Sequence, residues 1–361
     1  MIPLIVDLET EWRGGQNQAL LLLRGLYERG HAAELLATHG SSISHRAKKE
    51  GIYVHSVSRS MTRLSAASKI RSILAEDRVD IVHANEAHAV TATWLAVRNR
   101  NIPFIVSRRV GYPLRKGWIA QSRYRRADCI LANSQWVADQ AAASGADRAK
   151  IRVVHEGTQI PSLLTSAQRA QARQRWGVAE GTPLLGCVGV LLPDKGQEWL
   201  IRALAEVRKE IPDARLLLAG DGSSRRELEQ LVDSLKLSRA VIFAGFVKDV
   251  ESVYAALDVF LLPSFFEALN NSLLAAMSYE IPSIAFSRGA LTEIIEDGKS
   301  GLFVSGPDVG EISSAIKRLL RDQQFARTLG QEARLRVINN FSAERMVEGT
   351  LKVYEEVLGN G

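Results

Sequence analysis

Residues 262–304 read LPSFFEALNNSLLAAMSYEIPSIAFSRGALTEIIEDGKSGLFV, and they carry the strongest structural signal in the chain. The apolar run Val259 to Leu262 predicts a strand, and Pro282 to Phe286 predicts the next one. Between them, Glu267 lies in a loop and Asn270 to Met277 predicts a helix. A loop and a helix N-terminus at the carboxyl end of a strand form the usual ligand site of a parallel sheet. The unpaired N–H groups of such a helix start suit a phosphate.

The rest of the chain repeats this alternation of short apolar runs and amphipathic stretches, which predicts βα units and parallel sheets. The expected strands of a first sheet are Ile2–Val6, Ala33–Ala37, Ile81–His83, Phe104–Ser107, Cys129–Ala132 and Val153–His155. Those of a second sheet are Leu184–Val188, Leu216–Ala219, Val241–Ala244, Val259–Leu262, Ser283–Phe286 and Leu302–Val304. Gly157 and Pro161 interrupt the pattern between the two series. The sequence therefore predicts two doubly wound α/β domains, 1–163 and 164–341, followed by a helix within 342–361.

Length and composition agree with this organisation. A chain of 361 residues that is 46% hydrophobic is long enough for two domains. Its two cysteines, Cys129 and Cys187, each lie inside an expected strand, which favours buried free thiols over a disulfide. No apolar run approaches the ~20 residues that span a bilayer, and Met1 leads directly into the first expected strand. We therefore expect a cytoplasmic protein that is neither secreted nor membrane-spanning.

Positive charge is concentrated in the first half of the chain. Residues 1–163 contain 23 Lys and Arg against 14 Asp and Glu, whereas the remainder contains 23 against 26. One segment mixes basic and aromatic residues: Arg108, Arg109, Tyr112, Arg115, Lys116, Trp118, Arg123, Tyr124, Arg125 and Arg126. This mixture suits an anionic membrane surface bearing phosphorylated glycolipid, and a solvated basic face explains it equally well. Nucleic acid is not expected as a partner, since no recognised nucleic-acid-binding motif occurs.

The stretch from 262 to 304 resembles the donor-sugar site of glycosyltransferase family 4, a family of retaining enzymes with the two-domain GT-B fold. The family pattern is Pro-Ser, a short gap, Glu-Gly-Phe-Gly, a helix with Glu-Ala-Met, and Gly-x-Pro-Val. Six positions match it here: Pro263, Ser264, Glu267, Ala276, Met277 and Pro282. The resemblance implies two Rossmann-like domains that face each other across a cleft, the first binding the acceptor and the second the nucleotide-sugar donor. It also implies that the last helix returns to the first domain.

Two further segments resemble family motifs that approach the donor's diphosphate. Val188 to Gly196 resembles Gly-Arg-Leu followed by Lys-Gly, which implies that Gly189 and Lys195 meet the diphosphate. Gly14 and Gly15, in RGGQ, resemble the family's N-terminal diglycine loop. Two glycines there let main-chain N–H groups approach a ligand closely. The structural alternatives are an ordinary surface lysine for the first motif and a tight turn for the second.

The resemblance implies further donor contacts in the second domain. The expected contacts are Gly245, Phe246 and Val247 at the nucleotide base, Asn270, Asn271 and Ser272 at the helix start, and Glu293 in SRGALTE. The base contacts are made by main-chain groups in the family, so they rest on position alone. Glu293 also suits a purely structural place in the first turn of a helix, close to its positive end.

Three positions depart from the family pattern. The glutamate that holds the ribose falls on Ala275, the diphosphate arginine falls on Val190, and the cleft histidine falls on Arg109. Because arginine stays protonated near neutral pH, Arg109 suits a carboxylate or a phosphate and cannot act as a general base. His83 and Asn85 form a weaker alternative pair at the same edge.

The resemblance implies a glycosyltransferase that uses a nucleoside diphosphate sugar, and no cofactor, to glycosylate a cell-envelope acceptor such as lipopolysaccharide core or another glycolipid. We expect Glu267, Lys195 and Arg109 to be its catalytic residues. No metal site is expected, because the seven histidines lack ligand spacing and no Asp-x-Asp occurs. Two other classes stay open: a non-catalytic binding or scaffold protein that has lost part of the donor site, and, less favoured, a sugar-nucleotide epimerase. Peripheral association with the cytoplasmic face of the inner membrane is expected through the basic N-terminal domain.

Overall fold

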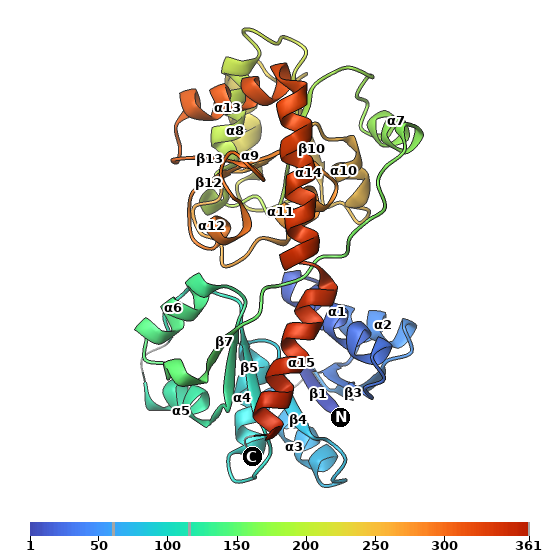
Figure 1. The fold of residues 1–361 in the computed structure, drawn as a ribbon, viewed down its shortest axis with the longest axis vertical. Coiled ribbons are helices and arrows are strands. Elements are labelled where there is room, and N and C mark those ends of the chain that lie inside the picture. The colour runs from blue at the N-terminus through green and yellow to red at the C-terminus, as the bar shows by residue number, and fades with distance from the viewer. Residues whose placement is uncertain (60–61, 115–116, 360–361) are drawn as a thin grey trace. The chain divides into compact units, whose positions relative to one another are not determined.

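The computed structural model describes residues 1–59, 62–114 and 117–359 of the chain. The chain divides into two compact units, Met1–Gly157 with Ser342–Gly361, and Thr158–Phe341 (Figure 1). We expected the join after residue 163, and the structure divides the chain after Gly157. In the described ranges, no helix is both long and apolar enough to cross a membrane.

The first unit is built on a seven-stranded parallel sheet with the order β3-β2-β1-β4-β5-β6-β7. Its strands are β1 (Pro3–Asp7), β2 (Glu34–Thr38), β3 (Tyr53–Val57), β4 (Ile81–Ala84), β5 (Phe104–Arg108), β6 (Cys129–Ala132) and β7 (Ile151–Val153). β1 pairs with both β2 and β4, so the order of the strands reverses between β1 and β4. Doubly wound sheets bind ligands beyond the carboxyl ends of their strands at such a switch point.

Helices cover both faces of this sheet, because Leu4 and Val6 of β1 enter one apolar core while Ile5 enters the other. The helices are α1 (Gly14–Glu28), α2 (Ser42–Lys49), α3 (Thr62–Leu74), α4 (Ala87–Val97), α5 (Trp118–Arg126), α6 (Gln135–Ala143) and α15 (Ala343–Gly359), with a 3-10 turn, η1 (Arg148–Lys150). The last helix, α15, packs on α1 of this unit (Figure 1). A Cβ on Gly25 would lie 2.5 Å from Cγ2 of Val347, so glycine permits this close packing.

The second unit repeats the same topology with a six-stranded parallel sheet in the order β10-β9-β8-β11-β12-β13. Its strands are β8 (Leu184–Val188), β9 (Arg215–Ala219), β10 (Val241–Gly245), β11 (Val259–Leu262), β12 (Ser283–Phe286) and β13 (Leu302–Val304). The switch point therefore lies between β8 and β11. The two sheets confirm the predicted α/β class with two doubly wound halves.

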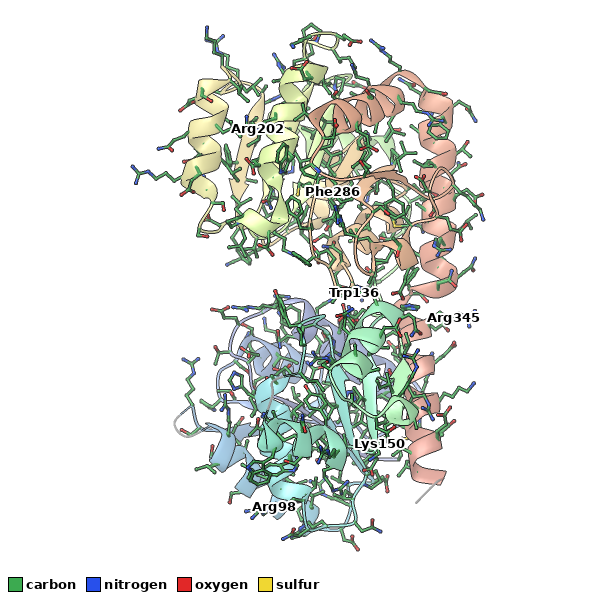
Figure 2. The ribbon with its side chains drawn as sticks, turned by 90° about the vertical axis from the view of Figure 1, so that its left-hand side faces the viewer. Arg98, Trp136, Lys150, Arg202, Phe286 and Arg345 are labelled. Carbon is green, nitrogen blue, oxygen red and sulfur yellow. The ribbon has the colours of Figure 1, made fainter. Side chains whose placement is uncertain are left out.

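Helices also enclose the second sheet in two apolar cores, one containing Phe286 and the other Phe260. They are α7 (Ser166–Arg175), α8 (Gln197–Val207), α9 (Arg225–Ser234), α10 (Glu251–Ala256), α11 (Asn271–Ser278), α12 (Leu291–Ile294), α13 (Val309–Arg321) and α14 (Gln323–Asn340), with a 3-10 turn, η2 (Pro193–Lys195). Figure 2 shows Phe286 in the interior of this unit and Arg202 on its surface.

Two strands of the first sheet differ from the prediction. β3 was not predicted, because it is an edge strand whose residues YVHSV are partly exposed and polar. The strand expected at 153–155 lies at Ile151–Val153. It begins earlier because η1 ends at Lys150 and Ile151 already pairs with Ile130 of β6.

Candidate functional site

An ion pair lies at the switch point of the second unit. Lys195 ends η2, which follows β8, and Glu267 lies in the loop after β11. Nζ of Lys195 lies 2.8 Å from Oε1 of Glu267, and the two side chains are 26% and 9% exposed. The structure thus brings together two of the predicted site residues, at the edge where doubly wound sheets bind ligands.

Main-chain contacts hold the two loops of this pair against each other. The N–H of Phe265 donates to the carbonyl oxygen of Asp194 at 3.0 Å. Gly196 has φ +67°, and a Cβ there would lie 2.3 Å from the carbonyl oxygen of Pro263. In the Lys-Gly motif, the lysine therefore has a chemical reason and the glycine has a packing reason, since only glycine fits this approach.

Gly189 and Gly245, both predicted donor contacts, lie on either side of the turn after β9. The N–H of Gly189 donates to the carbonyl oxygen of Ala219 at 2.9 Å. The N–H of Gly220 donates to the carbonyl oxygen of Gly245 at 2.8 Å. A Cβ on Gly220 would lie 1.9 Å from the carbonyl oxygen of Gly189. The carboxyl ends of β8, β9 and β10 are thus joined through their backbones, and Gly220 is the residue that permits it.

Val190, at the position of the family's diphosphate arginine, has a 53% exposed side chain. Its carbonyl oxygen accepts a hydrogen bond of 3.0 Å from Nε2 of Gln197, whose side chain is buried. Sequence reasoning missed Gln197. The available signal was its place directly after the Lys-Gly pair, at the first position of α8.

The predicted base-contacting loop presents Phe246, which is 75% exposed, while Val247 packs against an apolar core. Arg225, at the start of α9, lies beside this loop. Its guanidinium carbon is 5.8 Å from the ring centroid of Phe243, and a Cβ on Gly245 would lie 3.5 Å from its Nη1. The sequence did not indicate a cation beside this loop, because the position of Arg225 near Phe243 and Gly245 depends on the tertiary structure.

At the start of α11, side chains that were expected to meet the donor have internal partners. Oδ1 of Asn270 accepts from the N–H of Leu273 at 2.8 Å and so caps the helix. The hydroxyl of Ser272 forms a hydrogen bond with Tyr254, whose pKa is raised by burial. Asn271 occupies the first helical position. What α11 offers a ligand is therefore mainly its first main-chain N–H groups.

Glu293 lies in α12, after a turn that supports the Glu267 loop. Gly289 has φ +54°, and a Cβ there would lie 2.6 Å from the carbonyl oxygen of Glu267. The same carbonyl accepts from the N–H of Ala290 at 3.1 Å. The side chain of Glu293 is half-buried, and its main-chain oxygen accepts from Nη2 of Arg336 at 2.8 Å.

Both thiols are free and buried, as predicted from the sequence. Burial, and to a smaller extent the Glu267 carboxylate, raises the pKa of the Cys187 thiol to about 12. Burial likewise raises the pKa of Cys129 to about 12. Neither thiol is ionised near neutral pH, so neither supplies a nucleophile there.

Asp7 organises the switch point of the first unit, where the diglycine motif lies. Its Oδ2 accepts from Nε2 of Gln16 at 2.9 Å and from Nδ2 of Asn85 at 2.6 Å. Nδ2 of Asn85 also lies 3.1 Å from the carbonyl oxygen of Gly15. Burial raises the pKa of Asp7 above its ordinary value. This network fixes the beginning of α1, where Gly14 and Gly15 are located.

Arg109, the third predicted catalytic residue, lies at the same edge of the first sheet, and other protein groups already bind its side chain. Its Nη1 donates to the carbonyl oxygen of Asn85 at 2.6 Å, and its Nε lies 3.0 Å from Oε1 of Glu156. Burial lowers the pKa of Arg109, and the Glu156 carboxylate opposes this shift. Two of its three nitrogen atoms are therefore already engaged by protein groups.

His83, the weaker alternative, is buried between two hydroxyl groups. Its Nδ1 lies 2.6 Å from Oη of Tyr354, and its Nε2 lies 2.7 Å from Oγ of Ser107. Burial lowers the pKa of His83 to about 3, so the imidazole is neutral. The histidine ties α15 to the sheet, which is a structural role.

One group of three side chains within the described ranges has its oxygen and nitrogen atoms close enough for a metal ion: Glu9, Glu86 and His88, within 4.8 Å of one another. Glu86 caps α4 by accepting from the main-chain N–H groups of His88 and Ala89. Burial, and to a smaller extent Asp7, raises the pKa of Glu86 to about 7. Nε of Arg63 donates to Nδ1 of His88 at 3.0 Å. Because this guanidinium opposes a second cation beside the imidazole, we assign no metal to the group.

Part of the basic segment expected at a membrane is turned inward. Arg108 is 6% exposed and donates to Oη of Tyr124 and to the carbonyl oxygen of Tyr112. With Arg109 also engaged internally, these two arginines do not form an outward basic face, and that part of the expectation is wrong. Tyr112 and Trp118 are 72% and 73% exposed. Arg115 and Lys116 lie outside the described residues.

Comparisons with known proteins converge on one family. Residues 12–160 match the family model "Glycosyltransferase Family 4", and residues 182–322 match "Glycosyl transferases group 1". The chain is 26% identical over 352 residues to the GDP-mannose-dependent alpha-(1-6)-phosphatidylinositol monomannoside mannosyltransferase of Mycolicibacterium smegmatis, covering 91% of each. It is 27% identical over 294 residues to the lipopolysaccharide core biosynthesis glycosyltransferase LpsE of Rhizobium meliloti, covering 81% of each. A solved structure of HepE from Anabaena in complex with UDP superposes with a TM-score of 0.87 at 22% identity, over 99% of this chain and 100% of that one.

Proposed function

Because this chain belongs to glycosyltransferase family 4 and adopts the GT-B fold, we propose that it moves a sugar, with retention, from a nucleoside diphosphate sugar to a cell-envelope acceptor. The relatives support the acceptor class, since their names specify a phosphatidylinositol mannoside and lipopolysaccharide core biosynthesis. Lipopolysaccharide core or another glycolipid is the acceptor that we propose. The donor is a substrate, and the proposal requires no cofactor.

The pair Lys195–Glu267 carries this proposal. The ammonium group of Lys195 has three donors and directs one of them to Glu267. The other donors suit the diphosphate, for which a hydrogen bond to a charged group contributes about 1.5–3 kcal/mol. Glu267 accepts from Lys195 through Oε1, so its second oxygen suits a sugar hydroxyl. Main-chain N–H groups at the start of α11 complete the donor site.

The chemistry follows from the same groups and uses no metal in this proposal. The bond from the sugar's anomeric carbon to the diphosphate oxygen breaks, and a bond from that carbon to the acceptor oxygen forms on the same face. The departing diphosphate takes the proton of the acceptor hydroxyl. Lys195 stabilises the charge that develops on the leaving group, without help from Val190 and without a ribose carboxylate at Ala275.

The first unit contributes the acceptor side in this proposal. Arg109 and Asn85 hold the diglycine segment in place through Gly15, so Arg109 is a positioning residue. Exposed Tyr112 and Trp118 provide aromatic contacts for a peripheral association with an anionic membrane.

Calorimetric titration with uridine, guanosine, adenosine and cytidine diphosphates and their sugars tests the proposal. Lys195→Ala is expected to weaken binding of the preferred nucleotide about tenfold or more, whereas Glu267→Ala removes the advantage of the sugar form. Lys209→Ala is the matched control, because Lys209 is an exposed lysine of the same unit that pairs with Glu206. If no nucleotide binds at millimolar concentration, the transferase proposal fails and the scaffold alternative replaces it.

A further inference from the structure

A basic hollow lies at the amino ends of strands β5, β6 and β7 of the first unit, at the opposite edge of the sheet from Asp7 and Arg109. Its volume is about 660 Å³. Four segments line it: the three segments that precede these strands in the sequence, and the end of α15. Its charged side chains are Arg98, Arg100, Arg126, Lys150 and Arg152, with Asp128 and Glu356. Five cations against two carboxylates leave an excess of positive charge.

Two of these cations are fixed by main-chain oxygen atoms. Nη2 of Arg126 donates to the carbonyl oxygen of Ile102 at 3.0 Å, and its Nη1 donates to Asp128 at 3.0 Å. Nζ of Lys150 donates to the carbonyl oxygens of Arg125 at 2.9 Å and Ala127 at 3.0 Å. Carbonyl oxygens satisfy hydrogen bonds but leave the ammonium charge of Lys150 unbalanced, and its third donor stays available.

The remaining cations differ in their partners. Nε of Arg152 lies 3.0 Å from Oε2 of Glu356. Arg98 and Arg100 are exposed, and neither side chain has a hydrogen-bond or ion-pair partner within the described residues. Figure 2 labels Arg98 and Lys150, which come from two of the converging segments. Two unengaged guanidinium groups thus line a hollow whose other cations already have protein partners.

We propose that this hollow binds a phosphate group, carried either by a soluble phosphorylated molecule or by an anionic lipid headgroup. Guanidinium groups present paired N–H donors that match phosphate oxygens. Ordering Arg126 and Lys150 before binding lowers the entropy lost on complex formation. The site is separate from the proposed donor site, which belongs to the second unit.

The test compares Arg98→Ser/Arg100→Ser with Lys48→Ser/Lys49→Ser. Both pairs remove two exposed cations from the first unit, so they change its long-range field equally. Each protein, together with wild type and Lys195→Ala, is titrated calorimetrically with inorganic pyrophosphate. Each is also sedimented with phosphatidylcholine vesicles that contain or lack phosphatidylglycerol. Thermal unfolding of all variants verifies that they are folded.

Arg98→Ser/Arg100→Ser is expected to weaken one of the two interactions about tenfold or more, while Lys48→Ser/Lys49→Ser changes neither. Loss of pyrophosphate binding identifies a soluble ligand, and loss of vesicle binding identifies a lipid headgroup. Lys195→Ala is expected to retain whichever interaction Arg98→Ser/Arg100→Ser weakens. That result distinguishes the hollow from the donor site even if the proposed function fails. If the two double variants behave alike in both assays, the hollow contributes only diffuse charge and the proposal is overturned.

Discussion

Replacing Gly196 with alanine is expected to disrupt the contact between the loops that carry Lys195 and Glu267. At φ +67°, the new Cβ lies 2.3 Å from the carbonyl oxygen of Pro263. The left-handed backbone costs an L-residue about 1–2 kcal/mol, and forcing the main chain apart costs about 1–3 kcal/mol more. Gly177 has φ +61°, and its Cβ would meet no described atom within 4 Å. Gly177→Ala therefore carries the backbone cost alone.

The two variants are compared by thermal unfolding and by nucleotide titration. For a unit of this length, 1 kcal/mol shifts Tm by about 2–4 °C. Gly177→Ala should then lower Tm by roughly 4 °C and Gly196→Ala by roughly 10 °C. Only Gly196→Ala should weaken nucleotide binding, by about tenfold or more, because only it moves Lys195. Equal Tm values for the two variants, or wild-type nucleotide affinity in Gly196→Ala, would refute the packing argument.

Four further predictions follow from individual residues. Because Ala275 offers no carboxylate to the ribose, a 2′-deoxynucleoside diphosphate should bind within about threefold of the ribonucleotide in calorimetry, and a large difference would reveal another ribose contact. The pKa of Glu86 is about 7 in the folded protein against 4.5 ordinarily. Between these two pH values the folded state therefore keeps a proton on Glu86 that the unfolded chain releases. The stability of the first unit should therefore fall as pH rises through this window, and Glu86→Gln should flatten the profile of Tm against pH. With pKa values of about 12, Cys129 and Cys187 should not react with a thiol reagent at about pH 8 until denaturant is added. Arg109→Lys cannot reach both Asn85 and Glu156 as the guanidinium does, so it should cost about 1–3 kcal/mol in denaturant unfolding, whereas exposed Arg125→Lys should have little effect.

The fold was readable from the sequence where strands are buried on both faces. Val259–Leu262 and Cys129–Ala132 were predicted with their observed bounds because each is a continuous apolar run ended by turn residues. Helix α7 was not predicted, since its sequence SAQRAQARQR lacks an apolar face. It is held by long-range polar contacts instead: Arg173 donates to the carbonyl oxygen of Ala256 at 3.0 Å and to Asp258 at 3.2 Å. Such partners are distant in sequence and leave no local pattern.

The position of the candidate site could be predicted, and its internal pairing could not. Lys195 and Glu267 follow strands whose carboxyl ends meet at one edge, so topology alone brings them near each other. That they form an ion pair depends on the Gly196 contact with Pro263, which no motif reveals. In the first unit, the motif position of Arg109 suggested a substrate contact. Its partner Glu156 follows a different strand, and only the tertiary structure shows that the two side chains are paired.

The ion pair also determines how the donor site should respond to a sugar. Without a ligand, the charge of Lys195 is balanced by Glu267, and Val190 adds no second cation. A free nucleoside diphosphate therefore brings its negative charge close to a carboxylate that is 9% exposed, where repulsion is poorly screened. A sugar gives that carboxylate hydroxyl groups to accept from, which offsets the repulsion and favours the intact donor over the released diphosphate. Glu267→Ala removes the repulsion together with the sugar contact, so it should strengthen binding of the free diphosphate, weaken binding of the sugar form and thereby abolish the preference for the intact donor.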